Sequence, residues 1–165
     1  MSGADRAYPI LLALGALDAA GYSLIAPVAP EIAEATGAGP ALIGLLVATF
    51  PLAMIAGFLA GSVLVRRSRI RLLLVVSLVT IAGGTALFVL GGGLDVYFVA
   101  RALMGVGSGG LWIGVTFGTL ERWPGREYLC MSRVFSAYAV GGLAGPALGA
   151  LSGLRLPFLA YLVLV

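Results

Sequence analysis

The sequence predicts an all-α membrane protein. Of its 165 residues, 61% are hydrophobic and only 10% are charged, and the mean hydropathy is +1.09. Soluble domains carry about 25% charged residues, and a fold of this length could not hide so much apolar surface from water. Apolar runs near the ~20 residues that cross a bilayer recur along the chain. Two of them flank the arginine-rich stretch GSVLVRRSRIR, Gly61 to Arg71, and a short basic loop between apolar spans is typical of membrane proteins.

Composition also disfavours other classes of protein. The net charge is +3, but the basic residues flank apolar runs instead of forming an exposed stripe, which argues against nucleic-acid binding. Histidine is absent, so the usual zinc sites and histidine-based catalysis are not expected. Cys130 is the single cysteine and cannot form an intramolecular disulfide. No span or loop gathers catalytic residue types, so we expect no enzyme activity, no metal and no cofactor.

The first predicted span covers residues 10–30. Asp18 lies in its middle and no convincing cleavage site follows, which favours a retained transmembrane helix over a secretion signal. Residues 31–40, polar and without a basic residue, are expected to form a loop. The second span, 41–65, carries no charge and is longer than the ~20 residues needed, and Pro51 is expected to kink it.

The later spans are predicted at 72–90, 96–120 and 134–151, with a partial sixth at 156–165. A glycine-rich turn at 91–95 separates the third span from the fourth, and a charged loop at 121–133 precedes the fifth. The last run is about half the length that a crossing requires. We therefore expect a partial six-helix bundle, with five full spans and the start of a sixth.

The arginines are distributed unevenly between the two sides of this arrangement. The opposite side holds Arg155 together with Glu31, Glu34 and Asp95, whereas one side holds eight arginines: Arg6, Arg66, Arg67, Arg69, Arg71, Arg122, Arg126 and Arg133. We expect a multi-pass protein of the plasma membrane, and the positive-inside rule predicts that its N-terminus is cytoplasmic. The loops 66–71 and 121–133 should also be cytoplasmic.

Glycines recur at four-residue spacing inside the predicted spans, as Gly57/Gly61, Gly105/Gly109 and Gly141/Gly145/Gly149. Small residues one turn apart let helix backbones approach closely in a membrane. This packing role accounts for the spacing. Helices that slide and rock against each other, as a transporter needs, are the functional alternative.

Two ionisable residues, Asp18 and Arg101, lie within spans. A charge at mid-bilayer costs about 2.5–3.5 kcal/mol or more, so such residues usually face a cavity or a partner. Both are candidates for proton coupling. Their predicted depths differ by ~9 Å at 1.5 Å per residue, so direct pairing would stretch the arginine. A hydrogen bond from Asp18 to nearby backbone, and an Arg101 side chain that reaches the outer interface, are the structural alternatives.

Helical spacing places further polar and aromatic side chains beside these two. At ~100° per residue, Arg101, Ser108 and Trp112 share one side of the fourth span. Asp18 and Tyr22 are four residues apart and share a side of the first. An acid, an arginine and two aromatic rings around one cavity would suit exchange of protons against a lipophilic or cationic substrate. Tyr22, Ser108 and Trp112 are therefore substrate-cavity candidates, with simple packing as the alternative for the two aromatic residues.

Four segments resemble motifs of one transporter family, in the same order. In the first span Asp18 stands nine positions before Pro27. The stretch GSVLVRRSRIR is similar to the signature loop G-x-L-A-D-R-x-G-R-R, and the candidate residues of this loop are Gly61, Arg66, Arg67, Arg69 and Arg71. RALMGVGSGG, from Arg101, is similar to R-x-x-Q-G-x-G. GGLAGPALGA, residues 141–150, is similar to the antiporter motif G-x-x-x-G-P-x-x-G-G through Gly141, Gly145, Pro146 and Gly149.

These four segments are similar to motifs of the major facilitator superfamily, and the chain departs from the motifs at four positions. Val65 stands at the aspartate of the signature loop, and Ser68 at its glycine. In the family this aspartate belongs to a cytoplasmic charge cluster that stabilises one conformation, so we expect weaker gating here. Met104 replaces the glutamine of the fourth-span motif, and Ala150 the last glycine of the fifth-span motif.

The chain thus resembles the N-terminal half of a major facilitator superfamily transporter, most closely the multidrug and vesicular amine proton antiporter branch. The resemblance implies alternating access and proton-coupled export of a small lipophilic or cationic molecule. Its implied partners are the lipid bilayer, the substrate, protons and a C-terminal half of six more helices. The alternative is a non-transporting truncated fragment that acts only by assembling with a partner. A reading frame that continues through six more spans would favour the transporter.

Overall fold

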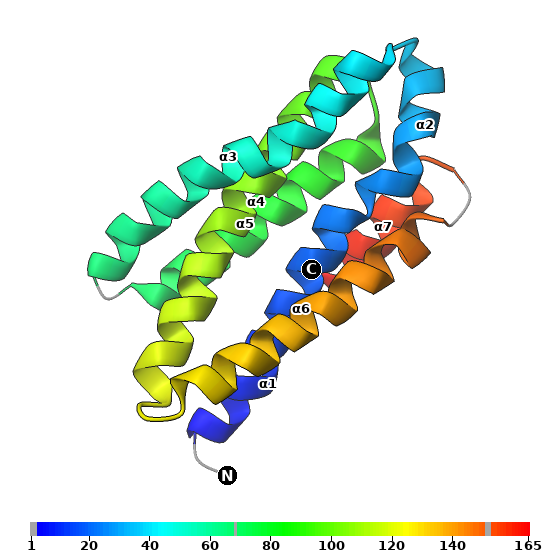
Figure 1. Cartoon of the computed structure of the whole chain (residues 1–165). Coiled ribbons are helices and arrows are strands. Elements are labelled where there is room, and N and C mark those ends of the chain that lie inside the picture. The colour runs from blue at the N-terminus through cyan, green and yellow to red at the C-terminus, as the bar shows by residue number, and fades with distance from the viewer. Residues whose placement is uncertain (1–2, 68, 151–152) are drawn as a thin grey trace.

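A computed structural model describes residues 3–67, 69–150 and 153–165, with side chains from residue 7 onward. Its elements are all helices (Figure 1): α1 (Gly3–Ser23), α2 (Ile25–Thr36), α3 (Pro40–Arg66), α4 (Ile70–Leu90), α5 (Leu94–Arg122), α6 (Glu127–Gly149) and α7 (Leu156–Leu164). The predicted all-α class is confirmed. The predicted positions Ser68 and Leu151 lie outside the described residues.

Four helical segments in the described part of the chain are long and apolar enough to cross a membrane: Ala7–Thr36, Pro40–Arg66, Ile70–Leu90 and Leu94–Arg122. They correspond to the first four predicted spans. Helix α6 has 23 residues, which at 1.5 Å per residue reaches about 34 Å. Its length would suffice, but Glu127 and Arg133 make its first turns polar, so the fifth span remains a prediction.

The first span consists of two helices that meet at Leu24. Pro27 has no N–H to donate, and its ring crowds the carbonyl four residues earlier, at Ser23. The Ser23 hydroxyl instead donates to the Ala19 carbonyl at 2.7 Å. Proline at the predicted motif position therefore coincides with the break between α1 and α2.

Two predicted loops are mostly helical. Helix α2 continues to Thr36 and ends at Gly37, whose φ of 67° suits glycine, so the loop expected at 31–40 is wrong over its first half. Ile32 is buried and anchors this extension. The loop expected at 121–133 is likewise confined to a short turn, because α6 already begins at Glu127. Helix α3 also runs past Pro51 without interruption.

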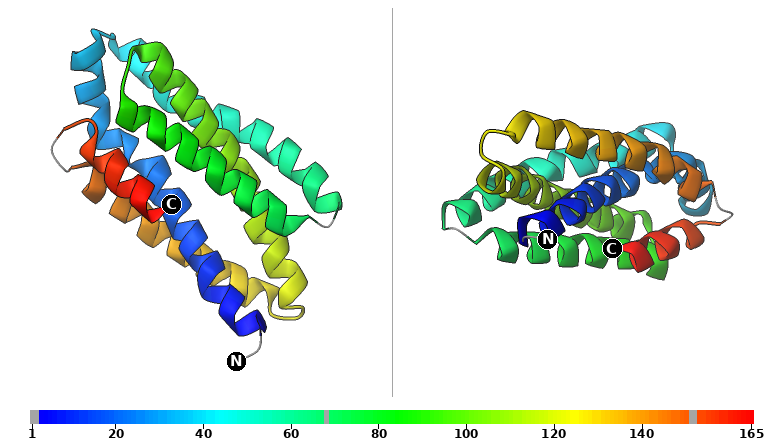
Figure 2. Two further views of the ribbon diagram at one scale, coloured as in Figure 1. Left: turned by 180° about the vertical axis from the view of Figure 1, so that it is seen from behind. Right: turned by 90° about the horizontal axis from the view of Figure 1, so that it is seen from below.

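Helix α5 lies at the centre of the bundle and packs along both α3 and α4, while α1 packs mainly along α6 and α4 also contacts α7 (Figures 1 and 2). Glycine makes the α3–α5 contact close. A Cβ at Gly57 would overlap the Val106 carbonyl, and one at Gly105 would overlap the Phe50 carbonyl. The predicted packing role of these glycines is confirmed.

The α1–α6 contact has the same character. Gly141, Gly145 and Gly149 are buried at successive turns of α6 and lie against the backbone of α1 and the start of α2, at Ala16, Ala20 and Leu24 respectively. Pro146 is exposed. Glycines four apart on one helix thus meet residues four apart on the other, which holds α1 and its acidic residue firmly against α6.

Candidate functional site: a buried acid and a buried arginine

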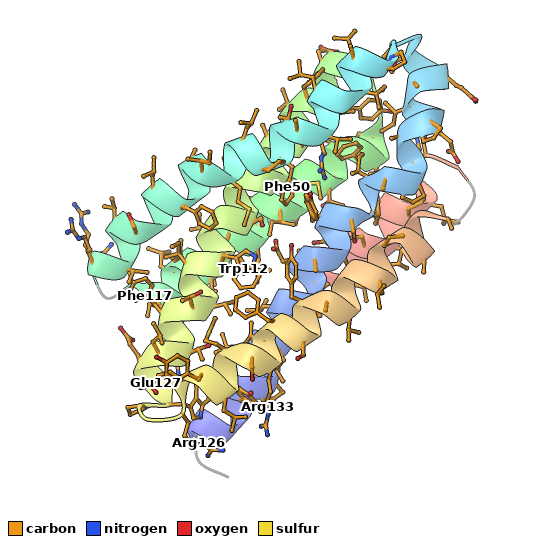
Figure 3. All side chains as sticks on the ribbon, in the orientation of Figure 1. Phe50, Trp112, Phe117, Arg126, Glu127 and Arg133 are labelled. Carbon is orange, nitrogen blue, oxygen red and sulfur yellow. The ribbon has the colours of Figure 1, made fainter. Side chains whose placement is uncertain are left out.

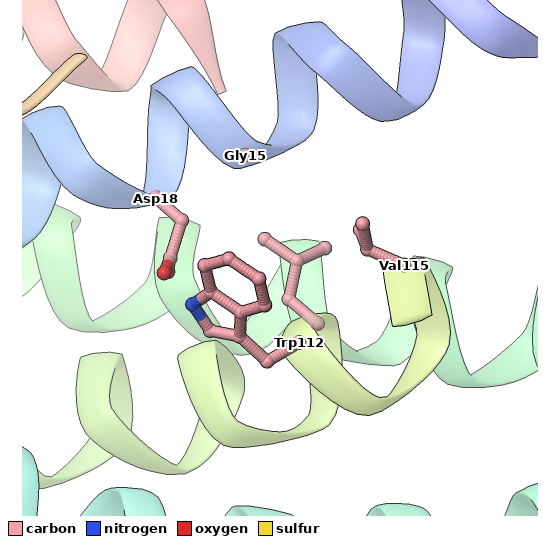
Figure 4. A pocket seen from close by; sticks show the side chains of 5 residues that line it. Gly15, Asp18, Trp112 and Val115 are labelled. Carbon is pink, nitrogen blue, oxygen red and sulfur yellow. The ribbon is translucent and has the colours of Figure 1, made fainter. Parts of the chain in front are cut away.

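Asp18 lies on α1 and is only 4% exposed. The hydroxyl of Ser108, on α5, donates to its Oδ2 atom at 3.0 Å. The indole nitrogen of Trp112 faces the same carboxyl group (Figure 4). The space around this cluster is too narrow for a water molecule, and it is lined by Gly15, Asp18, Leu111, Trp112 and Val115. The acid is therefore hydrogen-bonded to a side chain of another helix, and not to neighbouring backbone.

Trp112 connects this carboxyl group to α6. Its ring centroid lies 5.2 Å from that of Tyr138 and 5.5 Å from that of Phe135. Phe135 is exposed, whereas Trp112 and Tyr138 are partly buried. An aromatic wall thus extends from the buried acid to the surface of the bundle.

Arg101 is completely buried on α5. Its guanidinium carbon lies 4.6 Å from the centre of the Phe50 ring, on α3. Among the residues that the structure describes, none forms a hydrogen bond with its three guanidinium nitrogens. The side chain does not reach the outer interface, so the snorkelling alternative is wrong.

Tyr22 belongs to the arginine cluster and not to the acid cluster. Its ring lies 5.2 Å from that of Phe50, and it is 40% exposed. Ser108 follows Arg101 by seven residues on α5, which corresponds to ~10 Å along the helix. The candidates expected around one cavity are therefore divided between two neighbouring clusters. One can bind and release a proton at a carboxylate, and the other holds a permanent cation.

Sequence reasoning missed Phe50, Tyr138 and Tyr161. The Tyr161 hydroxyl, on α7, donates to the Leu17 carbonyl at 3.1 Å, directly before Asp18. Its ring fills the space that a side chain at Gly21 would occupy. A glycine beside the acid was the available signal, but one sequence does not show which aromatic residue lies opposite it.

The signature-loop residues lie at one end of the bundle. Arg66, Arg67, Arg69 and Arg71 are exposed around the junction of α3 and α4, whereas Gly61 is buried against α5 beside Gly110 and Ile113. The structure shows the surroundings of two residues that depart from the family motifs. Met104 is buried against Gly84 of α4, and Val65 is partly buried at the end of α3. Met104 therefore contributes helix packing where the motif has a polar amide.

Comparison with protein families gives a match to the model of the Major Facilitator Superfamily over residues 11–165. Comparison with curated proteins gives no significant match. The family match extends from α1 to the end of α7, and so includes both buried clusters and the arginine-rich end of the bundle. The chain belongs to the major facilitator superfamily and is a membrane-spanning transporter domain.

Proposed function

We propose that this domain serves proton-coupled export of a small lipophilic or cationic molecule, by alternating access, as in the antiporter branch. The observation that carries the proposal is the buried carboxyl group of Asp18. It is the only acid within the predicted spans, and a side chain of a second helix holds it in place. Acidic residues inside membrane spans are costly and commonly belong to proton relays.

The surroundings of Asp18 support both states of a proton cycle. When ionised, the carboxylate accepts hydrogen bonds from Ser108 and can attract a cationic substrate. When a proton binds, the negative charge is neutralised and that attraction is lost. Proton binding on one side of the membrane would thereby release substrate, and proton loss on the other side would restore its site.

The aromatic wall supports the proposed substrate class. Trp112, Tyr138 and Phe135 offer flat apolar surfaces beside the acid. Aromatic faces also attract cations, by about 0.5–2 kcal/mol according to exposure. A lipophilic cation would therefore contact the rings while its charge approached Asp18. We place the domain in the plasma membrane with its N-terminus in the cytoplasm, together with a C-terminal set of six helices.

Proton-driven efflux in everted vesicles tests the proposal. The protein is expressed from its complete coding sequence, and uptake of a fluorescent lipophilic cation is followed after a pH gradient is imposed. Asp18→Asn should abolish the gradient-driven uptake while the cation still binds, because asparagine cannot exchange a proton. Glu34→Gln, which removes an exposed acid of α2, is the matched control and should transport normally. Wild-type rates and pH dependence in Asp18→Asn would overturn the proposal.

A further inference from the structure

A second polar cavity lies away from the acid and arginine clusters, at the arginine-rich end of the bundle. It has a volume of about 180 Å³ and is lined by Tyr8, Trp123, Arg126, Cys130 and Arg133. These residues come from the start of α1, the turn between α5 and α6, and the first turns of α6. Figure 3 shows Arg126 and Arg133 near the beginning of α1. Neither the proposed proton step nor the family motifs use any of these side chains.

The cavity gathers hydrogen-bond donors. Both charged residues that line it are arginines, and both are exposed enough to turn toward a ligand. The Tyr8 hydroxyl oxygen is buried and has no hydrogen-bond partner among the described residues. Burying a polar group without a partner is unfavourable, so such a group commonly marks a site for a ligand or water. The ring of Tyr8 is fixed edge-on against Trp123, with centroids 5.1 Å apart.

Glu127, the acid that directly follows Arg126 in the sequence, is engaged elsewhere. The Gly125 N–H donates to the Glu127 carboxylate at 2.7 Å within the α5–α6 turn, which lowers the pKa of Glu127. Glu127 lines a separate groove with Tyr128 and Phe135. Among the side chains that the structure describes, the lining of this cavity therefore presents two arginines and no carboxylate.

We propose that this cavity binds a phosphate group, as found in the head group of an anionic phospholipid. Arginine forms forked, charge-assisted hydrogen bonds with phosphate oxygens, and a tyrosine hydroxyl supplies a further donor. The cavity volume of about 180 Å³ is several times the ~30 Å³ that one water molecule occupies in the liquid, which leaves room for a phosphate group. Tryptophan and arginine beside the end of a span are also typical of the membrane interface, where anionic lipid head groups lie. Bound phosphate would tie α1 to the turn between α5 and α6.

Thermal unfolding of the chain in detergent tests this site, with three probes added separately: phosphatidylglycerol, phosphatidylcholine and inorganic phosphate. A ligand that binds only the folded state raises the unfolding temperature. We expect phosphatidylglycerol to raise it more than phosphatidylcholine does. A rise with inorganic phosphate that phosphatidylglycerol does not exceed would support the same phosphate site and identify its ligand as soluble.

Variants separate the site from general attraction between charges. R126Q/R133Q should weaken the apparent affinity for the effective probe at least about tenfold, as loss of charge-assisted hydrogen bonds implies. R66Q/R71Q removes the same charge from exposed positions outside the cavity and should keep the wild-type affinity. Tyr8→Phe removes only the hydroxyl group, and should weaken binding several-fold without lowering the unfolding temperature of the ligand-free chain. The proposal is overturned if neither phosphatidylglycerol nor inorganic phosphate raises the unfolding temperature more than phosphatidylcholine does. It is also overturned if both double variants lose affinity equally.

Discussion

At the scale of single residues, the two buried ionisable groups differ in how they can relieve the cost of burial. Asp18 accepts a hydrogen bond from Ser108 and can become neutral by taking up a proton. Arg101 cannot become neutral in a similar way, because a guanidinium group stays protonated in proteins. Its contact with the Phe50 ring offsets only part of the cost of removing the charge from water. The described residues therefore give the buried guanidinium group of Arg101 little compensation for the loss of water.

This difference leads to a prediction for Arg101→Met, which removes the charge and leaves a flexible, unbranched apolar side chain. Replacing buried charges with apolar side chains of similar size often stabilises a protein by about 1–4 kcal/mol. We expect Arg101→Met to raise the free energy of unfolding in detergent and to impair transport by the full-length protein. Arg71→Met, at an exposed position, is the control and should change stability by less than about 0.5 kcal/mol. Destabilisation by Arg101→Met would show that the guanidinium group has stabilising partners in the folded protein.

At the scale of helices, glycine determines which pairs pack most closely. Helix α6 has two adjacent glycines, Gly141 and Gly142, of which one is closely packed and the other is not. Gly141 is buried against Ala16 of α1, whereas a Cβ at Gly142 would meet no atom within 4 Å. Neighbouring positions of one helix can thus distinguish the effect of contact with α1 from the effect of glycine on helix formation itself.

We predict opposite effects for Gly145→Ala and Gly142→Ala. A methyl group at Gly145 would overlap the Ala20 carbonyl and the Ser23 hydroxyl, and overpacking of this kind costs about 1–3 kcal/mol. At Gly142 the methyl group enters open space, and alanine favours a helix over glycine by up to about 1 kcal/mol. Thermal unfolding in detergent, followed by the loss of helical circular dichroism, measures both. Equal effects at the two positions would contradict close packing of α6 on α1.

At the scale of the whole molecule, composition and apolar run length were sufficient to predict an all-helical membrane protein. The four motifs and their order were sufficient to predict the family, which the family match over residues 11–165 confirms. The ends of the helices were harder to predict from the sequence. Apolar runs mark the part of a helix that lies in lipid, whereas α2 and α6 extend several residues into polar sequence at their ends.

The internal arrangement of the site was also only partly predictable. Spacing along one helix placed Ser108 and Trp112 on a common side of α5, and both lie beside Asp18. Which residues of other helices approach that side depends on how the helices cross. A single sequence does not contain that information, so the Phe50 ring under Arg101 and the Tyr161 bond beside Asp18 emerged only from the structure.

Orientation in the membrane is the last property of the whole molecule that the sequence predicts. Eight arginines on one side against one on the other predict that the α5–α6 turn faces the cytoplasm and the α2–α3 turn faces outward. Pro124 and Gly39 are exposed in these two turns, and a Cβ at Gly39 would meet no atom within 4 Å, so cysteine should be tolerated there. With Cys130 replaced by alanine, an impermeant thiol reagent applied to intact cells should label Gly39→Cys and leave Pro124→Cys unlabelled. Permeabilised cells should give labelling of both variants, which shows that each thiol is reactive. Labelling of Pro124→Cys but not Gly39→Cys in intact cells would show that the domain has the opposite orientation, and the proposed direction of proton and substrate movement would reverse with it.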